Sequence, residues 1–253
     1  MVSMMKQAIV RPPSSAFRRC ISAHPEHHAL DLSLAQEQHT EYCQALSNLG
    51  LKLIRLPPDE KHPDSCFVED TVVVHGKRGF MTRFAEESRR GEEFAVAEVL
   101  KDYLELGFAR KPATIEGGDI IHLPGRLITG ITRRTNSKGV KQMSRWLGIK
   151  SDTIEEESII HLKSHVTYLD RNTIVVTEDF ESHPTLQDFD RIVVPREEAY
   201  AANTLTIGNA VLMSKRHQKV QTLVREAGFE VMPLDMSEFE KCEGALTCLS
   251  VMF

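Results

Sequence analysis

Short apolar runs alternate with amphipathic stretches along most of this chain. The runs at residues 7–10 and 51–56 have the length of strands and end at pairs of prolines. Elsewhere apolar residues recur every three or four positions, as on one face of a helix. This spacing predicts helices over residues 31–50, 86–107, 137–148 and 215–228. The pattern therefore predicts an α/β fold.

Pairs of strand-like runs separated by turn residues predict hairpins. They lie at 66–74 with 79–83, 113–123 with 126–131, 159–169 with 173–177, and 204–207 with 211–214. A polar residue enters the first strand of each hairpin, and Cys248 holds the same place in the last apolar run, 245–252. The positions are Asp70, Glu116, His161, Asn203 and Cys248, at intervals of 46, 45, 42 and 45 residues. We infer an internal repeat of about 45 residues in five copies.

The fifth copy lacks a second strand after residue 252, and residues 7–10 can supply it. Such pairing would close the repeats into a ring. We therefore expect a five-bladed α/β propeller with pseudo-fivefold repeats, formed by one catalytic domain over residues 1–253. The five marked side chains would then face one central channel. An ordinary α/β sheet with evenly spaced elements is the alternative.

The side chains facing that channel would include a thiol, an imidazole and carboxylates. Cys248, His161 and Glu116 have the chemistry of a nucleophile, a general acid or base and a residue that orients it. A free cysteine is also a common buried apolar residue, and a histidine on a strand can be a hydrogen-bonded core residue. His165 and His122 are the rival histidines by strand placement.

A second group of charged residues suits the recognition of an amino acid. Glu69 and Asp70 follow an apolar run, and Asp64 lies in the loop before them. Arg83 and Arg134 follow the second strands of the first two hairpins. Carboxylates can hold a guanidinium, and arginine can grip a carboxylate with two hydrogen bonds. The set predicts an arginine-like ligand, although each residue could instead have a structural partner or a solvated position.

Composition excludes several classes of protein. The net charge of −5 and the absence of a basic patch argue against a nucleic-acid partner. The apolar runs are too short for a membrane span, and residues 1–6 lack the apolar core of a signal peptide. The five cysteines are odd in number and form no Cys-x-x-Cys pair. We expect a reduced cytoplasmic protein rather than a disulfide scaffold or a zinc protein.

At these residues the chain resembles the dimethylarginine dimethylaminohydrolase family of the pentein superfamily. The similar stretches span nearly the whole chain, and their order and spacing together make the resemblance specific. They include Glu-Gly-Gly-Asp, His-Leu-Lys-Ser and Leu-Thr-Cys-Leu-Ser. They occupy residues 56–60, 63–70, 88–92, 116–119, 134–136, 161–164, 201–203 and 246–250. The length and the Val-Met-Phe ending look like the bacterial branch. The resemblance implies the five-bladed pentein fold.

The resemblance also implies a reaction. Cys248 would attack the guanidinium carbon of asymmetric dimethylarginine or monomethylarginine, and His161 would act as general acid and base, oriented by Glu116. A covalent thiouronium would form on the cysteine, and water would release citrulline after dimethylamine or methylamine departs. No metal or organic cofactor is required. The family pattern is compatible with a homodimer.

The implied binding residues divide according to the part of the substrate that they contact. Asp70 and Glu69 would hold the guanidinium nitrogens. The α-carboxylate and α-amino groups would be bound by Arg83 and Arg134, by Asp64, and by the backbone carbonyls of Ile21 and Cys242. The Ile21 match needs a one-residue gap, and Cys242 stands where the family usually has an aliphatic residue.

Lys163 separates this chain from close relatives. Arginine deiminases and amidinotransferases carry His-x-Asp, whereas the residue two places after His161 is Lys163. Losing that carboxylate reduces the demand for N–H donors, which favours a methylated guanidinium. An arginine deiminase-like or other guanidine-modifying hydrolase is the alternative enzyme, and a ligand-binding propeller module is the non-enzymatic alternative.

Overall fold

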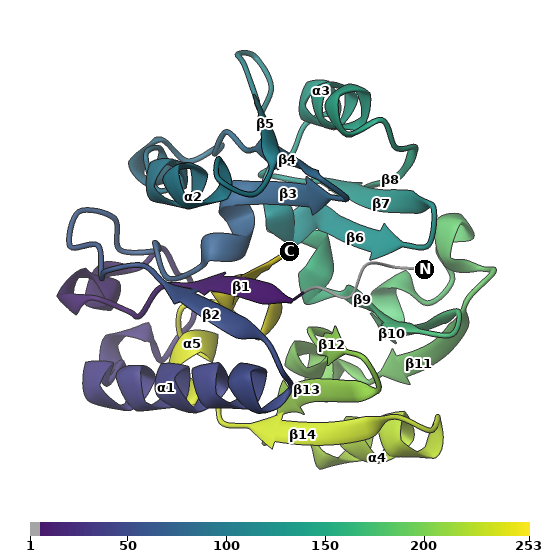
Figure 1. Ribbon diagram of the computed structural model, residues 1–253. Helices are drawn as coiled ribbons and strands as arrows, with labels where there is room; N and C mark the ends of the chain where they lie inside the picture. The colour runs from purple at the N-terminus through teal and green to yellow at the C-terminus, as the bar shows by residue number, and fades with distance from the viewer. Residues whose placement is uncertain (1–5) are drawn as a thin grey trace.

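The computed structural model describes residues 6–253, which contain fifteen strands arranged in five small sheets (Figure 1). The strands are β1 Gln7–Val10, β2 Lys52–Arg55, β3 Val72–His75, β4 Arg78–Met81, β5 Glu105–Phe108, β6 Ile120–Leu123, β7 Arg126–Ile131, β8 Ser151–Glu155, β9 Val166–Asp170, β10 Thr173–Thr177, β11 Asp190–Val194, β12 Leu205–Ile207, β13 Ala210–Ser214, β14 Glu230–Leu234 and β15 Val251–Met252.

Every sheet has three strands and the same topology. The orders are β3-β4-β5, β6-β7-β8, β11-β10-β9, β12-β13-β14 and β15-β1-β2. In each sheet the central strand pairs antiparallel with one neighbour and parallel with the other. This repetition confirms the predicted five-bladed α/β propeller.

The two ends of the described chain meet in the fifth sheet. Ala8 pairs with Met252 and Ile9 with Val251 in an antiparallel ladder. The amide of Phe253 donates to the carbonyl of Gln7 at 3.0 Å. The ring therefore closes as the sequence predicts, with β1 as the central strand of the blade that contains β15.

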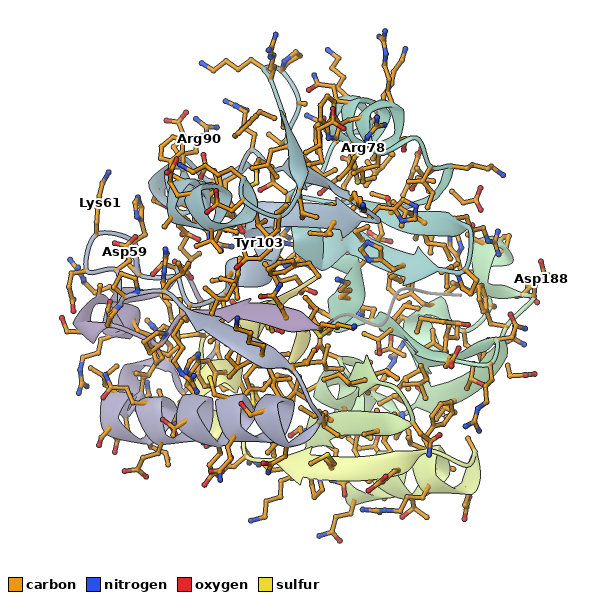
Figure 2. All side chains as sticks on the ribbon, viewed as in Figure 1. Asp59, Lys61, Arg78, Arg90, Tyr103 and Asp188 are labelled. Atoms are coloured by element: carbon orange, nitrogen blue, oxygen red, sulfur yellow. A yellow bond between two sulfur atoms is a disulfide. The ribbon has the colours of Figure 1, made fainter. Side chains whose placement is uncertain are left out.

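Helices lie on the outside of the ring and charged side chains project from it (Figures 1 and 2). The α-helices are α1 Leu32–Asn48, α2 Glu93–Leu100, α3 Ser137–Leu147, α4 Gln218–Glu226 and α5 Ser237–Glu240. Asp31 caps α1 by accepting from two backbone amides, and Gly148 ends α3 in the left-handed conformation. No helix in the described range 6–253 has both the length and the apolar character that crossing a membrane requires.

Two sequence predictions of local structure are wrong. The helix expected over 86–107 is only α2, and the residues after it form β5 against β4. The strand expected over 245–252 is only β15, because Cys248 lies in a 3₁₀ turn. Strands β8 and β11 were not predicted, because their polar residues obscure the alternation of apolar and polar positions. In each case tertiary pairing decides the conformation of a short segment.

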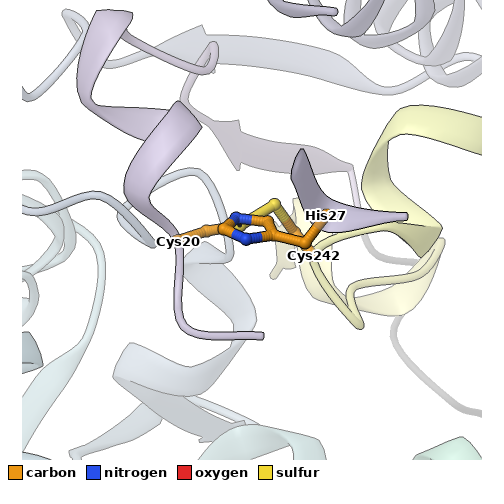
Figure 3. Close-up of side chains that lie close together, drawn as sticks. All are labelled: Cys20, His27 and Cys242. Atoms are coloured by element: carbon orange, nitrogen blue, oxygen red, sulfur yellow. Dashed lines mark hydrogen bonds between the residues drawn. A yellow bond between two sulfur atoms is a disulfide. The ribbon is translucent and has the colours of Figure 1, made fainter. Parts of the chain in front are cut away.

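The cysteines depart from the sequence expectation as well. Cys20 and Cys242 form a disulfide with their Cα atoms 6.0 Å apart, although 222 positions separate them in the chain (Figure 3). Cys43 and Cys66 are buried thiols, and Cys248 is a partly buried thiol. The fold brings the segment before α1 next to the segment after α5. The number of cysteines in the sequence does not predict this contact. The prediction that residues 1–6 do not begin a signal peptide concerns positions that lie almost entirely outside the described residues.

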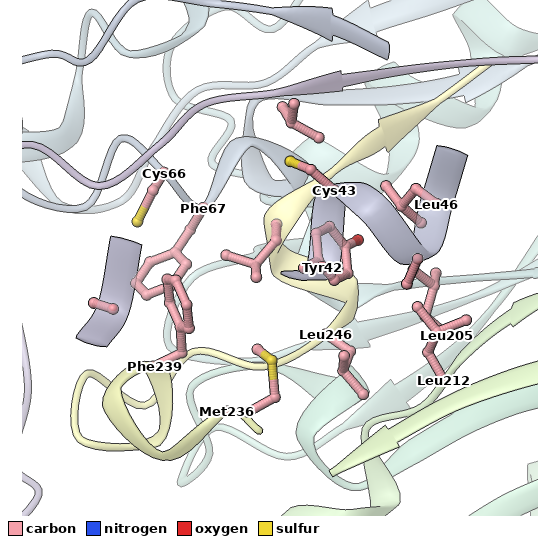
Figure 4. Packing of buried hydrophobic residues seen from close by; sticks show 14 of the residues in the cluster. Tyr42, Cys43, Leu46, Cys66, Phe67, Leu205, Leu212, Met236, Phe239 and Leu246 are labelled. Atoms are coloured by element: carbon pink, nitrogen blue, oxygen red, sulfur yellow. The ribbon is translucent and has the colours of Figure 1, made fainter. Parts of the chain in front are cut away.

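A core between α1, α5 and the C-terminal segment supports the chain around Cys248 (Figure 4). Leu246 and Leu249 are buried in it, on either side of Cys248 in the chain. The Tyr42 hydroxyl of α1 lies 2.8 Å from Ser250 Oγ. Packing on both sides therefore fixes the turn that carries Cys248.

Candidate active site

Five 3₁₀ turns surround the centre of the ring, one before the first strand of each sheet. They are η3 Val68–Thr71, η5 Gly117–Asp119, η6 Leu162–Ser164, η9 Arg196–Ala202 and η10 Thr247–Leu249. The turns η10, η3, η5, η6 and η9 contact one another in succession. The repeat positions Asp70, Glu116, His161, Asn203 and Cys248 lie in these turns or directly beside them. The sequence register thus located the centre, while the side chains are carried by turns rather than by strands.

His161 and Glu116 form a buried pair. His161 Nε2 lies 2.9 Å from Glu116 Oε2, and Glu116 has no exposed surface. Its other oxygen accepts a hydrogen bond from the amide of Ala85 at 3.1 Å. A Cβ at Gly118 would stand 2.7 Å from the imidazole, so a glycine is needed for the ring to approach this closely. The pair has one fixed arrangement.

The surrounding carboxylates hold His161 in its charged form. Burial alone would lower the pKa of His161, but Asp70, Glu116 and Asp119 outweigh it and raise the pKa to about 9. Asp70 Oδ1 is 3.7 Å from His161 Nε2 and accepts from the amide of Gly118 at 2.9 Å. At neutral pH the resting site therefore contains an imidazolium, which can donate a proton.

Cys248 is in the opposite situation. Burial, followed by the charges of Glu69 and Asp70, raises the pKa of its thiol to about 12. The cysteine is therefore a thiol when the pocket holds no cation. A positive ligand placed between the sulfur and these carboxylates would reverse the electrostatic part of this shift. The site is built to activate its sulfur when a cation binds.

A single narrow pocket of about 40 Å³ joins most of the residues that the sequence selected. Its lining includes the reactive pair, five further residues that the sequence selected, and Arg89, which the sequence did not select. These are Cys248 and His161, with Asp70, Asp64, Arg134, Arg89, Ile21 and Cys242. Glu116 stands behind His161, outside the lining. Ile21, which is 40% exposed, and Cys242 lie in this lining although 221 positions separate them in the chain.

Arg83 does not take the place that the sequence assigned to it. Its Nη1 donates to the carbonyl of Ala113 at 3.1 Å, and the residue does not line the pocket. Arg89 lines the pocket instead. The sequence signal for Arg89 was present in the similar stretch 88–92, but the repeat register favoured the arginine directly after a second strand.

Arg89 is the centre of a buried ion network. Its Nη1 lies 2.9 Å from Asp70 Oδ2 and its Nη2 lies 2.9 Å from Glu92 Oε2. The guanidinium also stacks on Phe84 with its carbon 4.5 Å from the ring centroid. Burial opposes the charge of Arg89, but Glu92 and Asp70 raise its pKa well above the ordinary value. Arg89 therefore stays charged and fixes the orientation of Asp70.

Arg134 is the pocket arginine with more freedom to bind a ligand. Its Nη1 lies 3.0 Å from Glu86 Oε1, and Glu86 is half exposed. The same nitrogen is buried and has no well-aligned hydrogen bond to any of residues 6–253. A carboxylate entering the pocket could satisfy it.

Glu69 is engaged away from the pocket lining. Lys163 Nζ lies 2.6 Å from one of its oxygens, and the Thr247 hydroxyl donates to the other at 2.7 Å. Burial raises the pKa of Glu69, and Lys163 works against that rise. Glu69 thus contributes charge near Cys248 without standing in the pocket lining.

Asp64 joins the pocket to the segment that covers it. Its Oδ1 accepts a hydrogen bond from the amide of Ile21 at 3.1 Å. Burial raises the pKa of Asp64, with Arg89 and Arg134 opposing. This carboxylate can bind an ammonium group beside the backbone of Ile21 and Cys242.

Two groups among residues 6–253 could in principle hold a metal ion: Asp70 with Glu116 and His161, and Cys20 with His27 and Cys242. In the first group, Glu116 already occupies His161 Nε2, and the imidazole is protonated below about pH 9. That group therefore functions as a proton-holding network. The second group lies at the edge of the pocket.

Comparisons with known proteins agree along almost the whole chain. The family model described as N,N dimethylarginine dimethylhydrolase, eukaryotic, matches residues 13–251. An N(G),N(G)-dimethylarginine dimethylaminohydrolase of Pseudomonas aeruginosa is 35% identical over 228 residues, covering 88% of this chain and 90% of that protein. One of Streptomyces coelicolor is 35% identical over 250 residues, covering 97% and 96%.

A solved structure gives the same result in three dimensions. The chain is similar to a cysteine-to-serine variant of the Pseudomonas aeruginosa enzyme in complex with citrulline. The TM-score is 0.95 at 32% identity, with 99% of this chain and 100% of that chain covered.

Proposed function

The chain belongs to the dimethylarginine dimethylaminohydrolase family, and on this premise we propose which of its residues carry the reaction. The protein hydrolyses asymmetric dimethylarginine or monomethylarginine to citrulline and dimethylamine or methylamine, through a covalent thiouronium on a cysteine. One observation supports the assignment most directly: Cys248 and His161 line the same pocket, and His161 is hydrogen-bonded to the buried Glu116.

The first half of the reaction uses the charges described above. The guanidinium enters between Asp70 and Cys248, and its positive charge lowers the pKa of the thiol, whose proton leaves to solvent. The thiolate attacks the guanidinium carbon and forms a tetrahedral adduct. The imidazolium of His161 donates its proton to the departing nitrogen. The C–N bond breaks, the amine leaves and the thiouronium remains on Cys248.

The second half consumes one water. Neutral His161 takes a proton from water, and the resulting hydroxide attacks the thiouronium carbon. The C–S bond breaks as the carbon–oxygen double bond of citrulline forms. The hydroxyl proton of the adduct passes to the departing sulfur, so the site returns to a protonated His161 and a neutral Cys248 thiol. Glu116 maintains the imidazole orientation through both halves.

The rest of the pocket provides the substrate contacts. Asp70 binds guanidinium nitrogens, with Glu69 contributing charge from behind. Arg134 binds the α-carboxylate, and Arg89 takes the place first assigned to Arg83. Asp64 binds the α-amino group together with the backbone carbonyls of Ile21 and Cys242.

Lys163 supports a methylated substrate over free arginine. Its ammonium group lies 2.6 Å from Glu69 Oε1 and offsets part of the charge of that carboxylate before a guanidinium enters. A site with two free carboxylates would favour free arginine, which has more N–H groups to donate. Where one of the two carboxylates is already paired, fewer donors are needed, so a methylated guanidinium loses less. This argument distinguishes the proposed substrate from that of a deiminase-like enzyme.

A product assay tests the proposal. Arginine and asymmetric dimethylarginine are supplied at equal concentration, and ammonia, dimethylamine and citrulline are measured. We expect dimethylamine to dominate and Cys248→Ser to abolish turnover while retaining substrate binding. A dominant ammonia signal would favour the deiminase-like alternative. Binding without either product in the unmodified protein would favour a non-enzymatic ligand-binding module.

Three broader proposals accompany this function. We propose that residues 1–253 act as one catalytic domain and that the protein forms a homodimer. The exposed large apolar side chains Phe94, Tyr103 and Phe108 support the homodimer, because a contact between two copies could bury them. A cytoplasmic location is also proposed. Sedimentation and cell fractionation test these proposals.

A further inference from the structure

Three potential metal ligands meet at the edge of the pocket, away from Cys248. The sulfurs of Cys20 and Cys242 and the ring nitrogen of His27 all lie within 4.8 Å of one another. His27 Nε2 is 3.3 Å from Cys20 Sγ. Figure 3 shows the imidazole lying against the disulfide, with Cys20 and His27 coming from one segment and Cys242 from the other. The proposed reaction uses none of these three side chains.

The disulfide by itself does not account for His27. A disulfide needs no third side chain, and its sulfurs are weak hydrogen-bond acceptors. Among the contacts of the described residues, the imidazole of His27 has Cys20 Sγ as its side-chain partner. A nitrogen directed at a pair of sulfurs is, however, the arrangement of a thiolate and imidazole metal site.

Cys20, His27 and Cys242, with the segments that carry them, form what we call the rim of the pocket. We propose that the reduced form of this rim binds Zn²⁺ through Cys20, Cys242 and His27, with water as the fourth ligand. A phosphine or dithiol reductant supplies two electrons to the S–S bond, which breaks, and two protons give two thiols. Binding of the cation releases both protons as the Zn–S bonds form. The imidazole adds a neutral nitrogen ligand.

The spacing of the donors fits this chemistry after a small movement. A tetrahedral zinc site places two sulfurs about 3.8 Å apart and a sulfur and nitrogen about 3.5 Å apart, given Zn–S near 2.3 Å and Zn–N near 2.05 Å. The sulfur–nitrogen separation of 3.3 Å is already close to this value. Opening the S–S bond therefore supplies most of the required change.

Contacts other than the disulfide keep the segment around Cys20 next to the segment around Cys242. Ser22 Oγ donates to the carbonyl of Lys241 at 2.8 Å, and the amide of Ala23 donates to Glu243 Oε2 at 2.8 Å. Lys241 Nζ donates to the carbonyl of Ala29 at 3.1 Å. The ligands therefore remain close after reduction. Since His27 is partly exposed, a metal ion can reach the site from solvent.

The position of the site gives it a consequence for the pocket. Ile21 follows Cys20 directly, and both Ile21 and Cys242 line the pocket. Zinc would hold the two segments together as the disulfide does, whereas the metal-free dithiol would leave only hydrogen bonds between them. The rim thus has two cross-linked forms, one oxidised and one metal-bound.

Cobalt binding tests the proposal in a full-length Cys248→Ser background, which removes the active-site thiol. The phosphine-reduced protein is titrated with Co²⁺, and thiolate-to-cobalt charge transfer and tetrahedral d–d absorption are recorded. Zn²⁺ is then added to displace the cobalt. We expect one Co²⁺ per chain with both absorptions, and neither absorption in the oxidised protein. His27→Gln should weaken binding about tenfold or more.

His28→Gln is the matched control, since His28 is the neighbouring exposed histidine and its ring contacts the carbonyl of Pro25. It should bind cobalt as the background protein does. Cys20→Ser and Cys242→Ser should each lose the charge-transfer absorption. The proposal is overturned if that absorption persists in either cysteine variant, if His27→Gln binds like His28→Gln, or if cobalt binds without thiolate absorption. Circular dichroism confirms that each variant is folded.

Discussion

Glu116 Oε2 lies 2.9 Å from His161 Nε2, and this pair of a fully buried carboxylate and a largely buried imidazole links two successive blades of the ring. Glu116 stands beside η5 and His161 beside η6, 45 positions apart. The internal repeat therefore has a chemical consequence, because it places a carboxylate from one blade against an imidazole from the next. The orientation of the proton donor depends on both.

Replacing Glu116 by glutamine should lower kcat much more than it changes KM. The amide keeps the shape of the side chain but removes the charge that holds His161 protonated and oriented. We expect a loss of about 100-fold or more in kcat. Steady-state kinetics measure it, with Glu105→Gln as an exposed control. A kcat within a factor of about two of the unmodified enzyme would contradict the role of Glu116.

The charge of His161 predicts a stability change at alkaline pH. Its pKa is raised to about 9 in the folded protein, against an ordinary value near 6.5. The resulting stabilisation is fully present below about pH 6.5 and is lost as pH rises through about 9. The unfolding free energy of the unmodified protein relative to His161→Gln should fall by about 3 kcal/mol over that window.

Urea unfolding at a series of pH values measures this difference, and NMR titration of the imidazole gives the pKa directly. An imidazole that titrates near its ordinary value would show that Asp70, Glu116 and Asp119 do not outweigh burial. Since the comparison is made against the glutamine variant, groups that do not interact with His161 cancel, whereas Asp70 and Asp119 lose the imidazolium that lowers their pKa values.

The fold could be predicted from sequence because it is repeated. Five polar positions at nearly constant spacing required one arrangement for all five, and residues 7–10 were available to complete the last sheet. The details of single elements carried no such redundancy. Strand β5 was read as the end of a helix because its apolar residues continue the helical spacing, and pairing with β4 decides its conformation.

The site was predicted where chemistry restricts the residue type and missed where only geometry decides. A thiol and an imidazole in register were sufficient to select Cys248 and His161. Two arginines near the end of one hairpin are chemically equal, and the bend after β4 turns Arg89 inward while Arg83 contacts a backbone carbonyl. The Cys20–Cys242 contact spans most of the chain, so no local pattern contains it.

Cys248 should react slowly with neutral alkylating reagents at neutral pH. Its pKa is raised to about 12 by burial and by Glu69 and Asp70, so little thiolate is present without a bound cation. A chloroacetamidine, which carries a positive amidinium, should inactivate the enzyme at least about tenfold faster than chloroacetamide of the same shape. Peptide mapping identifies the labelled residue.

Asp70→Asn should reduce this preference for the cationic reagent, because it removes one of the charges that attract it. The control is the rate for chloroacetamide, which has no charge to be attracted. Equal rates for the two reagents in the unmodified enzyme would show that the thiol is not activated by a bound cation.

Arg89 and Arg83 should differ strongly in stability tests. Arg89→Met leaves Asp70 and Glu92 buried without their cation, which should cost on the order of 3–5 kcal/mol and most of the activity. Arg83→Met loses a hydrogen bond to a carbonyl and should cost about 1 kcal/mol. Urea unfolding and kinetics on both variants decide whether Arg89 is the pocket arginine; similar costs would reject that assignment.

The last strand should be required for both fold and activity. Deleting residues 251–253 removes the pairing of β15 with β1, the burial of Val251 and the contact between the rings of Phe253 and Tyr103, whose centroids are 5.2 Å apart. Burial and hydrogen bonds together suggest a loss of about 5 kcal/mol. For a chain of this length that corresponds to a fall of roughly 10–20 °C in Tm.

Turnover should fall further than stability alone explains, because the turn η10 that carries Cys248 continues directly into this strand. Phe253→Ala keeps the strand pairing and removes the ring that contacts Tyr103 and packs against the neighbouring core, so it should lower Tm by a smaller amount and keep most of the activity. Thermal unfolding and citrulline formation are measured on both variants below their transitions. A deletion variant with normal Tm and normal turnover would show that closing the ring through β15 neither stabilises the fold nor positions Cys248.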